Sequence, residues 1–101
     1  MNTNILETEK GYLCSLEGWL DTNAAGELTT QIQPLIENAD KEIVIDCGLL
    51  EYISSSGLRV FLTLRKECAA KGGHVIIQNV NDEIRKVFTL TGFFNLFEIK
   101  S

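Results

Sequence analysis

The chain has 101 residues, of which 45 % are hydrophobic and 23 % are charged, and it carries a formal net charge of −5. This is the composition of an ordinary globular protein, and the length predicts one domain, residues 1–101, that can bury a core without disulfides or metals. The acidic excess argues against nucleic acid and against an anionic membrane surface as partners, because both are bound through Lys and Arg.

The N-terminal segment predicts a hairpin of two strands. Residues 5–9 and 12–20 are apolar or alternate in part between apolar and polar, and a turn at residues 10–11 separates them. The second strand ends in the tetrapeptide Gly-Trp-Leu-Asp, residues 18–21. We interpret Trp19 first as a core residue and, alternatively, as an exposed anchor for a partner, since Trp is frequent at binding hot spots.

A helix is expected to follow, with Thr22 or Asn23 as its N-cap. Pro34 falls inside the helical pattern. Because Pro removes a backbone hydrogen bond and clashes with the preceding turn, we expect a kink at residues 30–33 or two short helices. The apolar positions at helical spacing are Ala25, Leu28, Ile32, Leu35, Ile36 and Ala39.

A short apolar strand at residues 42–47 leads through a loop into three consecutive serines, residues 54–56. Residues 56–70 predict a helix, which the two glycines at 72–73 end. The serines therefore lie where the chain leaves a sheet and enters a helix, a place that favours both capping hydroxyls and a phosphate. The apolar positions of this helix are Leu58, Phe61, Leu62, Cys68 and Ala69.

Residues 74–78 predict another strand, and Asn81 is the expected N-cap of a third helix that Gly92 ends. The apolar residues after Gly92 predict a helical turn and a last strand. The apolar face of the third helix is Ile84, Val87, Phe88 and Leu90.

The predicted order of elements is β-β-α-β-α-β-α with a final strand. Strands that alternate with helices indicate a mostly parallel sheet with right-handed crossovers, to which the hairpin adds an antiparallel edge. Helices must cover at least one face, because the central strands are continuous apolar runs.

Cys14, Cys47 and Cys68 lie in or beside apolar segments and form no C-x-x-C pair, so we interpret them as small buried hydrophobes in a reducing cytosol. The N-terminus lacks the basic start and apolar stretch of a signal peptide. No apolar run approaches the ~20 residues of a membrane helix. A cytoplasmic protein is therefore expected.

No catalytic or metal site is indicated. The serines lack the first glycine of a G-x-S-x-G nucleophile elbow, and the sole histidine, His74, is interpreted as a surface strand residue rather than a general base. No residues have metal-ligand spacing and no phosphate loop is present, so neither a cofactor nor a small-molecule substrate is expected. Asp21 and Asp46 are an alternative pair for acid–base chemistry, but helix capping or loop tying is the favoured interpretation.

The serine turn has two interpretations. The hydroxyls can simply cap the helix, and Gly57 can simply permit close packing. Three hydroxyls exceed what one cap needs, however, and Tyr52 and Ile53 place apolar surface beside them. The turn is therefore also a candidate site for a regulatory modification.

Several segments together carry a resemblance to a known family: Ile43-Val44-Ile45-Asp46, Tyr52-Ile53-Ser54-Ser55-Ser56-Gly57-Leu58-Arg59-Val60, Gly18-Trp19-Leu20-Asp21, Gly72-Gly73, and Leu90-Thr91-Gly92 with Phe97. They resemble the signature of STAS domains, which are the bacterial anti-sigma factor antagonists (anti-anti-sigma factors) and related domains of sulfate transporters. The resemblance covers roughly residues 5–99.

The resemblance implies a STAS-type α/β fold, with a mixed, mostly parallel sheet, an antiparallel N-terminal hairpin and helices packed against it. It implies a switch protein without catalysis of its own. The unphosphorylated form would bind an anti-sigma factor that is also a serine kinase of the histidine-kinase-like ATPase type, and so release a sigma factor. The kinase would end the binding by phosphorylating the first serine of the S-S-G triplet, Ser55, and a PP2C-type phosphatase would restore it.

The expected partner-binding residues around Ser55 are Asp21, Tyr52, Ile53, Ser54, Ser56, Gly57 and Leu58. Ser54 stands where family members that are kinase substrates usually carry Asp, which leaves Ser54 and Ser56 as alternative phosphorylation sites. The alternative function is a non-phosphorylated STAS subunit of a transport or sensory complex, which would act as a constitutive interaction module. An enzyme that uses the serines is a third and more distant interpretation.

Overall fold

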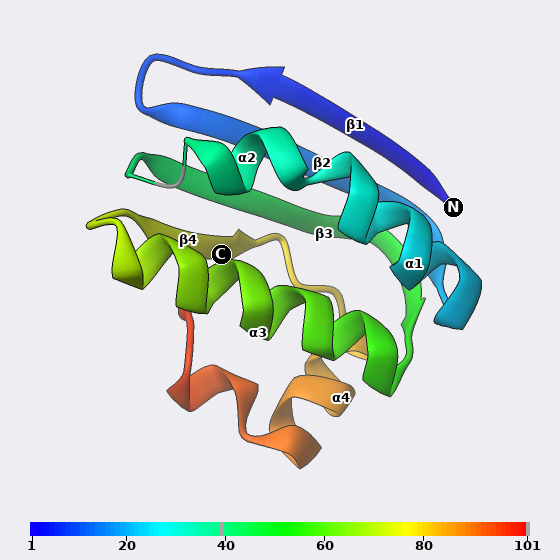
Figure 1. Cartoon of the computed structure of the whole chain (residues 1–101). Helices are drawn as coiled ribbons and strands as arrows, with labels where there is room; N and C mark the ends of the chain where they lie inside the picture. The colour runs from blue at the N-terminus through cyan, green and yellow to red at the C-terminus, as the bar shows by residue number, and fades with distance from the viewer. Residues whose placement is uncertain (39, 101) are drawn as a thin grey trace.

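Five strands form one mixed sheet in the order β1-β2-β3-β4-β5 (Figure 1). In this computed structural model, which describes residues 1–38 and 40–100, β1 (Asn2–Glu7) runs antiparallel to β2 (Gly11–Leu20). Parallel pairing then joins β2 to β3 (Glu42–Ile53), β3 to β4 (His74–Gln78) and β4 to β5 (Glu98–Lys100). The predicted mixed sheet with an antiparallel N-terminal hairpin is confirmed.

The helices lie on one side of this sheet. Figure 1 shows α1 (Thr22–Gln31), α2 (Gln33–Glu37) and α3 (Ser55–Ala70) in front of the strands, with α4 (Asp82–Thr91) and the 3-10 helix η1 (Phe93–Asn95) below α3. Their buried side chains join the inward face of the sheet in one hydrophobic core. None of the described helices combines the length and the apolar character that crossing a membrane requires.

The two faces of the sheet have different surroundings. The residues of β3 that pack against the helices are buried, namely Ile43, Ile45, Cys47, Leu50 and Ile53. No described helix covers the opposite face, which we call the open face. Its exposed apolar side chains are Leu6, Trp19, Leu49 and Tyr52.

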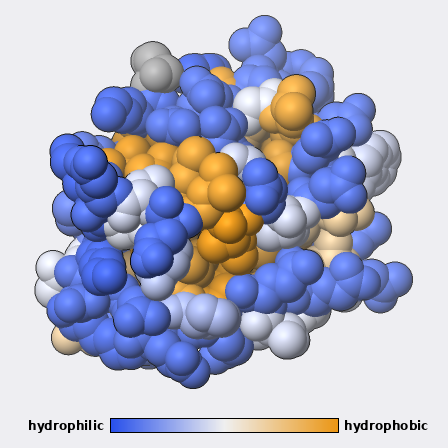
Figure 2. All heavy atoms as spheres, turned by 90° about the horizontal axis from the view of Figure 1, so that it is seen from above, coloured by the Kyte–Doolittle hydropathy of each residue, from blue (hydrophilic) through white to orange (hydrophobic). Residues whose placement is uncertain are grey.

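The view from above shows where the core approaches the surface. In Figure 2, apolar residues gather in the middle of this side of the molecule and hydrophilic residues border them. Ile5 of β1 and Ile36 of α2 are among the apolar residues that pack against the core while remaining partly exposed. The core therefore reaches the surface on this side.

The strand predicted at residues 42–47 is longer than expected. β3 continues to Ile53, and residues 48–53, predicted as a loop, still pair with β2. Two register shifts, between Ser15 and Glu17 and between Gly18 and Trp19 of β2, mark β-bulges in this stretch. The loop prediction was wrong because bulges break the two-residue period by which a strand is recognised in a sequence.

Other expectations about the helices are confirmed. The segment around Pro34 forms two short helices, and Pro34 lies in the first turn of α2, where no backbone donor is needed. Asn81 caps α4, and Gly92 ends it in the left-handed conformation with φ 77°. Gly72, with φ 85°, follows α3 in the same way.

Three residues assigned to apolar helix faces are instead exposed. They are Leu62 and Ala69 of α3, and Leu90 of α4, which is 87 % exposed. Fewer residues of each helix contact the core than the helical spacing of its apolar residues suggested, because each helix packs against the core on one side only. Ala39, assigned to the first helix face, lies outside the described residues.

The side chain of Asn81 joins α4 to the bulged part of β3. Its Oδ1 accepts a hydrogen bond from the backbone N–H of Ile84 at 3.0 Å, which caps the helix. Its Nδ2 donates to the backbone carbonyls of Leu50 at 2.6 Å, Cys47 at 3.1 Å and Gly48 at 3.3 Å. The bulge turns these carbonyls toward one amide, so one residue stabilises both the bulge and the start of α4.

We predict that Asn81→Ala lowers the free energy of unfolding by about 2–3 kcal/mol, because it removes the cap and leaves the carbonyls of the bulge without their donor. Asn81→Ser keeps an acceptor for Ile84 but lacks the amide, so its cost is smaller by about 1 kcal/mol. Urea denaturation measures both. Equal losses for the two variants would show that the cap contributes nothing.

Candidate functional site

The serine turn forms the junction between β3 and α3. Ser54 is the N-cap of α3: its Oγ accepts a hydrogen bond from the backbone N–H of Gly57 at 3.1 Å, and its carbonyl accepts from Leu58 N at 2.9 Å. Its own N–H donates to the carbonyl of Leu20 at the end of β2, also at 2.9 Å. α3 therefore begins at Ser55, one residue earlier than predicted, and Ser54 is the serine that caps it.

Ser55 is the first residue of α3 and is exposed. Within residues 1–38 and 40–100, its hydroxyl has no hydrogen-bond partner, and neither do the backbone N–H groups of Ser55 and Ser56. Unpaired N–H groups and the positive end of the helix dipole favour negative charge at such a position. Ser55 is therefore accessible, and its hydroxyl has no structural role in the described part of the chain.

Gly57 allows the first turn of α3 to lie directly on the ends of β2 and β3. A Cβ atom at this position would come within 2.7 Å of Leu20 Cγ and 2.9 Å of Ile53 Cγ1. Atoms that close cannot coexist, so any larger residue would push the helix away from the strands. The glycine thereby fixes the position of Ser55 relative to the sheet.

Of the apolar residues expected at the partner surface, two are buried and one is exposed. Ile53 and Leu58 are 4 % and 9 % exposed and belong to the core, as does Gly57. The expected contact of a partner with Ile53 and Leu58 therefore has to be corrected, because these side chains face the helix–sheet interface. Tyr52, by contrast, is 42 % exposed on the open face.

Trp19 is on the open face as well. It is 58 % exposed, and its ring centroid lies 5.0 Å from that of Tyr52, its partner across β2 and β3. The first interpretation of Trp19, as a core residue, was wrong. Its neighbour Leu20 takes the inward position instead, with 0 % exposure.

Asp21 lies beside the serine turn. It is the N-cap of α1, where its Oδ1 accepts from the backbone N–H of Ala24 at 2.9 Å, so neither Thr22 nor Asn23 is the cap. Because the hydrogen bond from Ser54 N to Leu20 O joins the two strand ends, α1 and α3 begin at the same edge of the sheet. The side chain of Asp21 is exposed there.

Asp46 belongs to a different place. It pairs with Ser15 of β2, six residues before Asp21, a separation of roughly 20 Å along a strand. Its carboxylate accepts hydrogen bonds from Gly48 N at 2.9 Å, Gln78 Nε2 at 3.0 Å and Asn79 Nδ2 at 2.9 Å. The two aspartates are not an acid–base pair, and both have the capping or loop-tying role that was favoured.

The histidine lies far from Ser55, and the cysteines are buried. His74 is the first residue of β4, and its Nε2 lies 3.3 Å from Oε1 of Glu42 at the start of β3. Both residues are at the opposite end of the sheet from Ser55. The cysteines are free and buried, and burial raises the pKa of Cys14 to about 11, of Cys47 to about 12 and of Cys68 to about 11. In the described part of the chain, no three His, Cys, Asp or Glu residues come together as metal ligands would.

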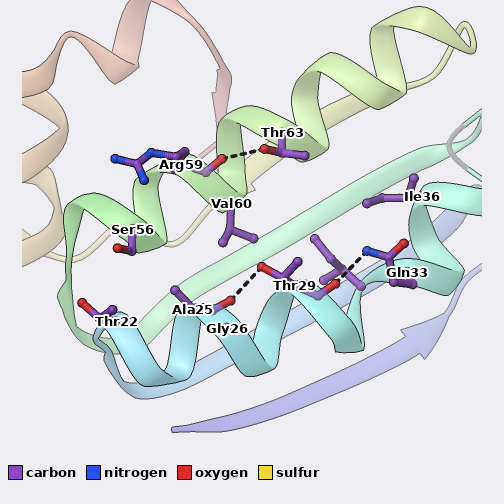
Figure 3. A pocket seen from close by; sticks show the side chains of 11 residues that line it. Thr22, Ala25, Gly26, Thr29, Gln33, Ile36, Ser56, Arg59, Val60 and Thr63 are labelled. Carbon is purple, nitrogen blue, oxygen red and sulfur yellow. Dashed lines mark hydrogen bonds between the residues drawn. The ribbon is translucent and has the colours of Figure 1, made fainter.

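A groove of about 270 Å³ runs between α1 and α3 and begins beside the serine turn. Figure 3 shows Thr22 and Ser56 at the end where both helices start, and Arg59 on the α3 side. Arg59 is exposed and follows Ser55 by four residues, so both lie along the same side of α3. Arg59 was not among the expected site residues, although its four-residue spacing from Ser55 could have indicated that the two side chains are neighbours.

With this geometry in place, comparison with known proteins identifies the family. Residues 3–101 match the family model described as the STAS domain. The chain belongs to the STAS domain family. The resemblance seen in the sequence is thereby confirmed over almost the whole chain.

Three proteins illustrate the similarity. A putative anti-sigma factor antagonist, BtrV of Bordetella bronchiseptica, is 29 % identical over 86 % of this chain and 75 % of its own. The anti-sigma-B factor antagonist of Staphylococcus aureus is 28 % identical over 98 % of this chain and 94 % of its own. The anti-sigma factor antagonist SpoIIAA in its unphosphorylated form is 22 % identical, superposes with a TM-score of 0.83, and covers 99 % of this chain and 89 % of its own.

The phosphorylated form of Bacillus SpoIIAA has also been solved. It superposes on this STAS domain with a TM-score of 0.75 and 24 % identity, covering 99 % of this chain and 92 % of its own. At these identities the two structures establish a shared fold.

We predict that Ser54→Ala lowers the free energy of unfolding by about 1 kcal/mol, because the N–H of Gly57 loses its acceptor. Ser55→Ala is the matched control and should change stability by less than about 0.5 kcal/mol, since its hydroxyl makes no described hydrogen bond. Urea denaturation of both variants measures the difference. A larger loss for Ser55→Ala than for Ser54→Ala would reverse the assigned roles.

We also predict that Asp46 contributes to acid sensitivity. Partial burial raises the pKa of its carboxyl group, but the hydrogen bonds from Gly48, Gln78 and Asn79 outweigh this and hold the pKa below its usual value of 3.8. The ionised carboxylate therefore stabilises the fold at pH values above 3.8, and this contribution is lost as the pH falls through the lowered pKa. Asp46→Asn should flatten this part of a stability profile measured between neutral and strongly acidic pH; an unchanged profile would exclude the contribution.

Proposed function

We propose that this STAS domain is an anti-sigma factor antagonist that is switched by phosphorylation of Ser55. The observation that carries the proposal is that the residues of the serine turn have different structural roles. Ser54 and Gly57 hold the start of α3, while Ser55 presents an exposed hydroxyl without a described partner. The names of the Bordetella and Staphylococcus relatives support the antagonist role, and the existence of a phosphorylated SpoIIAA supports the type of switch.

In the proposed cycle, the unphosphorylated domain binds an anti-sigma factor in the cytoplasm, and the sigma factor is released. The anti-sigma factor is also a serine kinase that transfers phosphate to Ser55, and a PP2C-type phosphatase removes it. A phosphate adds about −1.5 to −2 charges at neutral pH. At the first position of α3 the domain accommodates this charge, because the N–H groups of the first helical turn face it.

The effect of the phosphate therefore falls on the partner rather than on the fold. A bound partner would have to desolvate the new anion, and the exposed carboxylate of Asp21 at the same edge of the sheet adds to the negative charge there. A loss of about 3 kcal/mol weakens binding roughly a hundredfold. Such a switch acts through an interface without refolding the domain.

The proposed contact surface is the edge of the sheet where α1 and α3 begin. Asp21, Ser54 and Ser56 surround Ser55 there, and Tyr52 extends the surface around the end of β3 to the open face. Ile53, Gly57 and Leu58 support this surface from beneath. Ser54, in place of the Asp usual in kinase substrates of the family, keeps the capping hydrogen bond but carries no charge.

We predict that Ser55→Asp weakens binding to the anti-sigma factor of the source bacterium by roughly a hundredfold, whereas Ser55→Ala binds within about twofold of the unmodified protein. Thr89→Asp, an exposed position on α4, is the charge-matched control and should bind normally. Isothermal titration calorimetry measures all three. If Ser55→Asp binds as well as Thr89→Asp, the interface does not include Ser55.

The kinase step needs its own measurement. Incubation of the domain with ATP and the anti-sigma factor should add the mass of one phosphate, and the Ser55→Ala variant should gain none. Fragment masses distinguish Ser55 from Ser54 and Ser56. If no mass is gained while binding persists, the domain is a constitutive interaction subunit instead.

A further inference from the structure

A second surface lies on the open face of the sheet, away from α1 and α3. It consists of Trp19, Leu49 and Tyr52, which are 58 %, 67 % and 42 % exposed, and we call it the aromatic patch. The two rings are 5.0 Å apart between centroids and tilted by 32°, so they present one continuous aromatic surface. Leu49 pairs with Glu17, two residues before Trp19, and therefore lies next to the rings on the same face.

The packing of the core does not require large apolar side chains at these three positions. Leu20, Leu50 and Ile53 occupy the inward positions of the same strand ends and are 0 %, 0 % and 4 % exposed. The core would be complete with polar residues on the open side. Three large apolar residues exposed together are a feature of interaction surfaces, and Trp and Tyr are the residues most enriched among binding hot spots.

The charged side chains of the strand segments that carry the aromatic patch are acidic. Glu17 and Glu51 are exposed on the two strands that carry the patch, and Asp21 follows β2. Neither glutamate forms an ion pair within residues 1–38 and 40–100. The sequence contains no Lys or Arg between Gly11 and Asp40, so α1 and most of β2 bring no compensating charge to this region.

We propose that the aromatic patch binds a basic, apolar segment of a partner protein. A Lys or Arg side chain of that segment would lie over the Trp19 and Tyr52 rings, where a cation is attracted by the aromatic face, and an apolar side chain would contact Leu49. Glu17 and Glu51 would attract the cation and select against acidic partners. A second copy of this chain is a poor occupant, because two patches face to face would bring four glutamates together.

The proposal does not depend on the phosphorylation switch. The aromatic patch and the helices lie on opposite faces of the sheet, and neither Trp19 nor Leu49 belongs to the serine turn; Tyr52 alone is shared with the proposed contact surface of the anti-sigma factor. The surface would give the domain a second contact that a phosphate on Ser55 does not abolish.

The test uses a synthetic amidated peptide, Leu-Arg-Leu-Arg-Leu, and a matched peptide with Glu in place of Arg. Backbone amide NMR signals locate binding, and the fluorescence of Trp19, the only tryptophan of the chain, gives the dissociation constant. We expect the basic peptide to shift signals from residues 17–21 and 49–52, and the acidic peptide to shift none. Raising the salt concentration from low to about 0.5 M should weaken the binding, since exposed charges are then screened.

Variants separate the contributions of the rings and the charges. Trp19→Ala should abolish the peptide-induced NMR shifts without unfolding the domain, because the side chain is largely exposed. The double variant Glu17→Gln, Glu51→Gln keeps the rings and should weaken binding at least about fivefold. Ser55→Asp should leave the peptide affinity within about twofold, which distinguishes this surface from the switch.

Three results would overturn the proposal. They are equal binding of the acidic peptide, shifts that map to the helices instead of the aromatic patch, and concentration-dependent dimers in sedimentation that Trp19→Ala abolishes. The last result would assign the patch to self-association.

Discussion

The contact of Gly57 with Leu20 and Ile53 determines the geometry of the candidate site. It brings the first turn of α3 within van der Waals distance of two strand ends, closer than any side chain at residue 57 would allow. The hydrogen bonds of Ser54 to Leu20 and Gly57 then define where the helix begins. Because these interactions hold the turn, Ser55 is left as a surface group at a fixed place.

In the proposed switch, this arrangement separates folding from recognition between two neighbouring residues, Ser54 and Ser55. Loss of the Ser54 cap acts on stability, whereas a change at Ser55 acts on whatever touches the surface. A phosphate on Ser55 meets unpaired N–H groups on its own helix and thus costs the domain little, while a docked partner would have to desolvate it. Regulation at this serine is therefore compatible with an unchanged fold.

The two faces of the sheet also have different chemical character. Its helix side carries the core and the groove between α1 and α3, which opens next to Ser56. Its open side carries Trp19 and Tyr52, with the exposed carboxylates of Glu17 and Glu51 on the same two strands. With both surfaces meeting at the ends of β2 and β3, one end of the sheet offers two chemically different places for contact.

The sequence by itself determined the order of the elements, the mixed sheet, β4, the cap at Asn81 and the helix ends at Gly72 and Gly92. These are local signals, namely apolar periods, caps and glycines, each of which acts within a few residues. The full length of β3, the cap at Asp21, the burial of Ile53 and Leu58, and the exposure of Trp19 were decided only by the tertiary structure. The physical reason is that bulges shift the phase of a strand, so the side to which a residue points depends on its pairing with the neighbouring strand and on the helix packed against it.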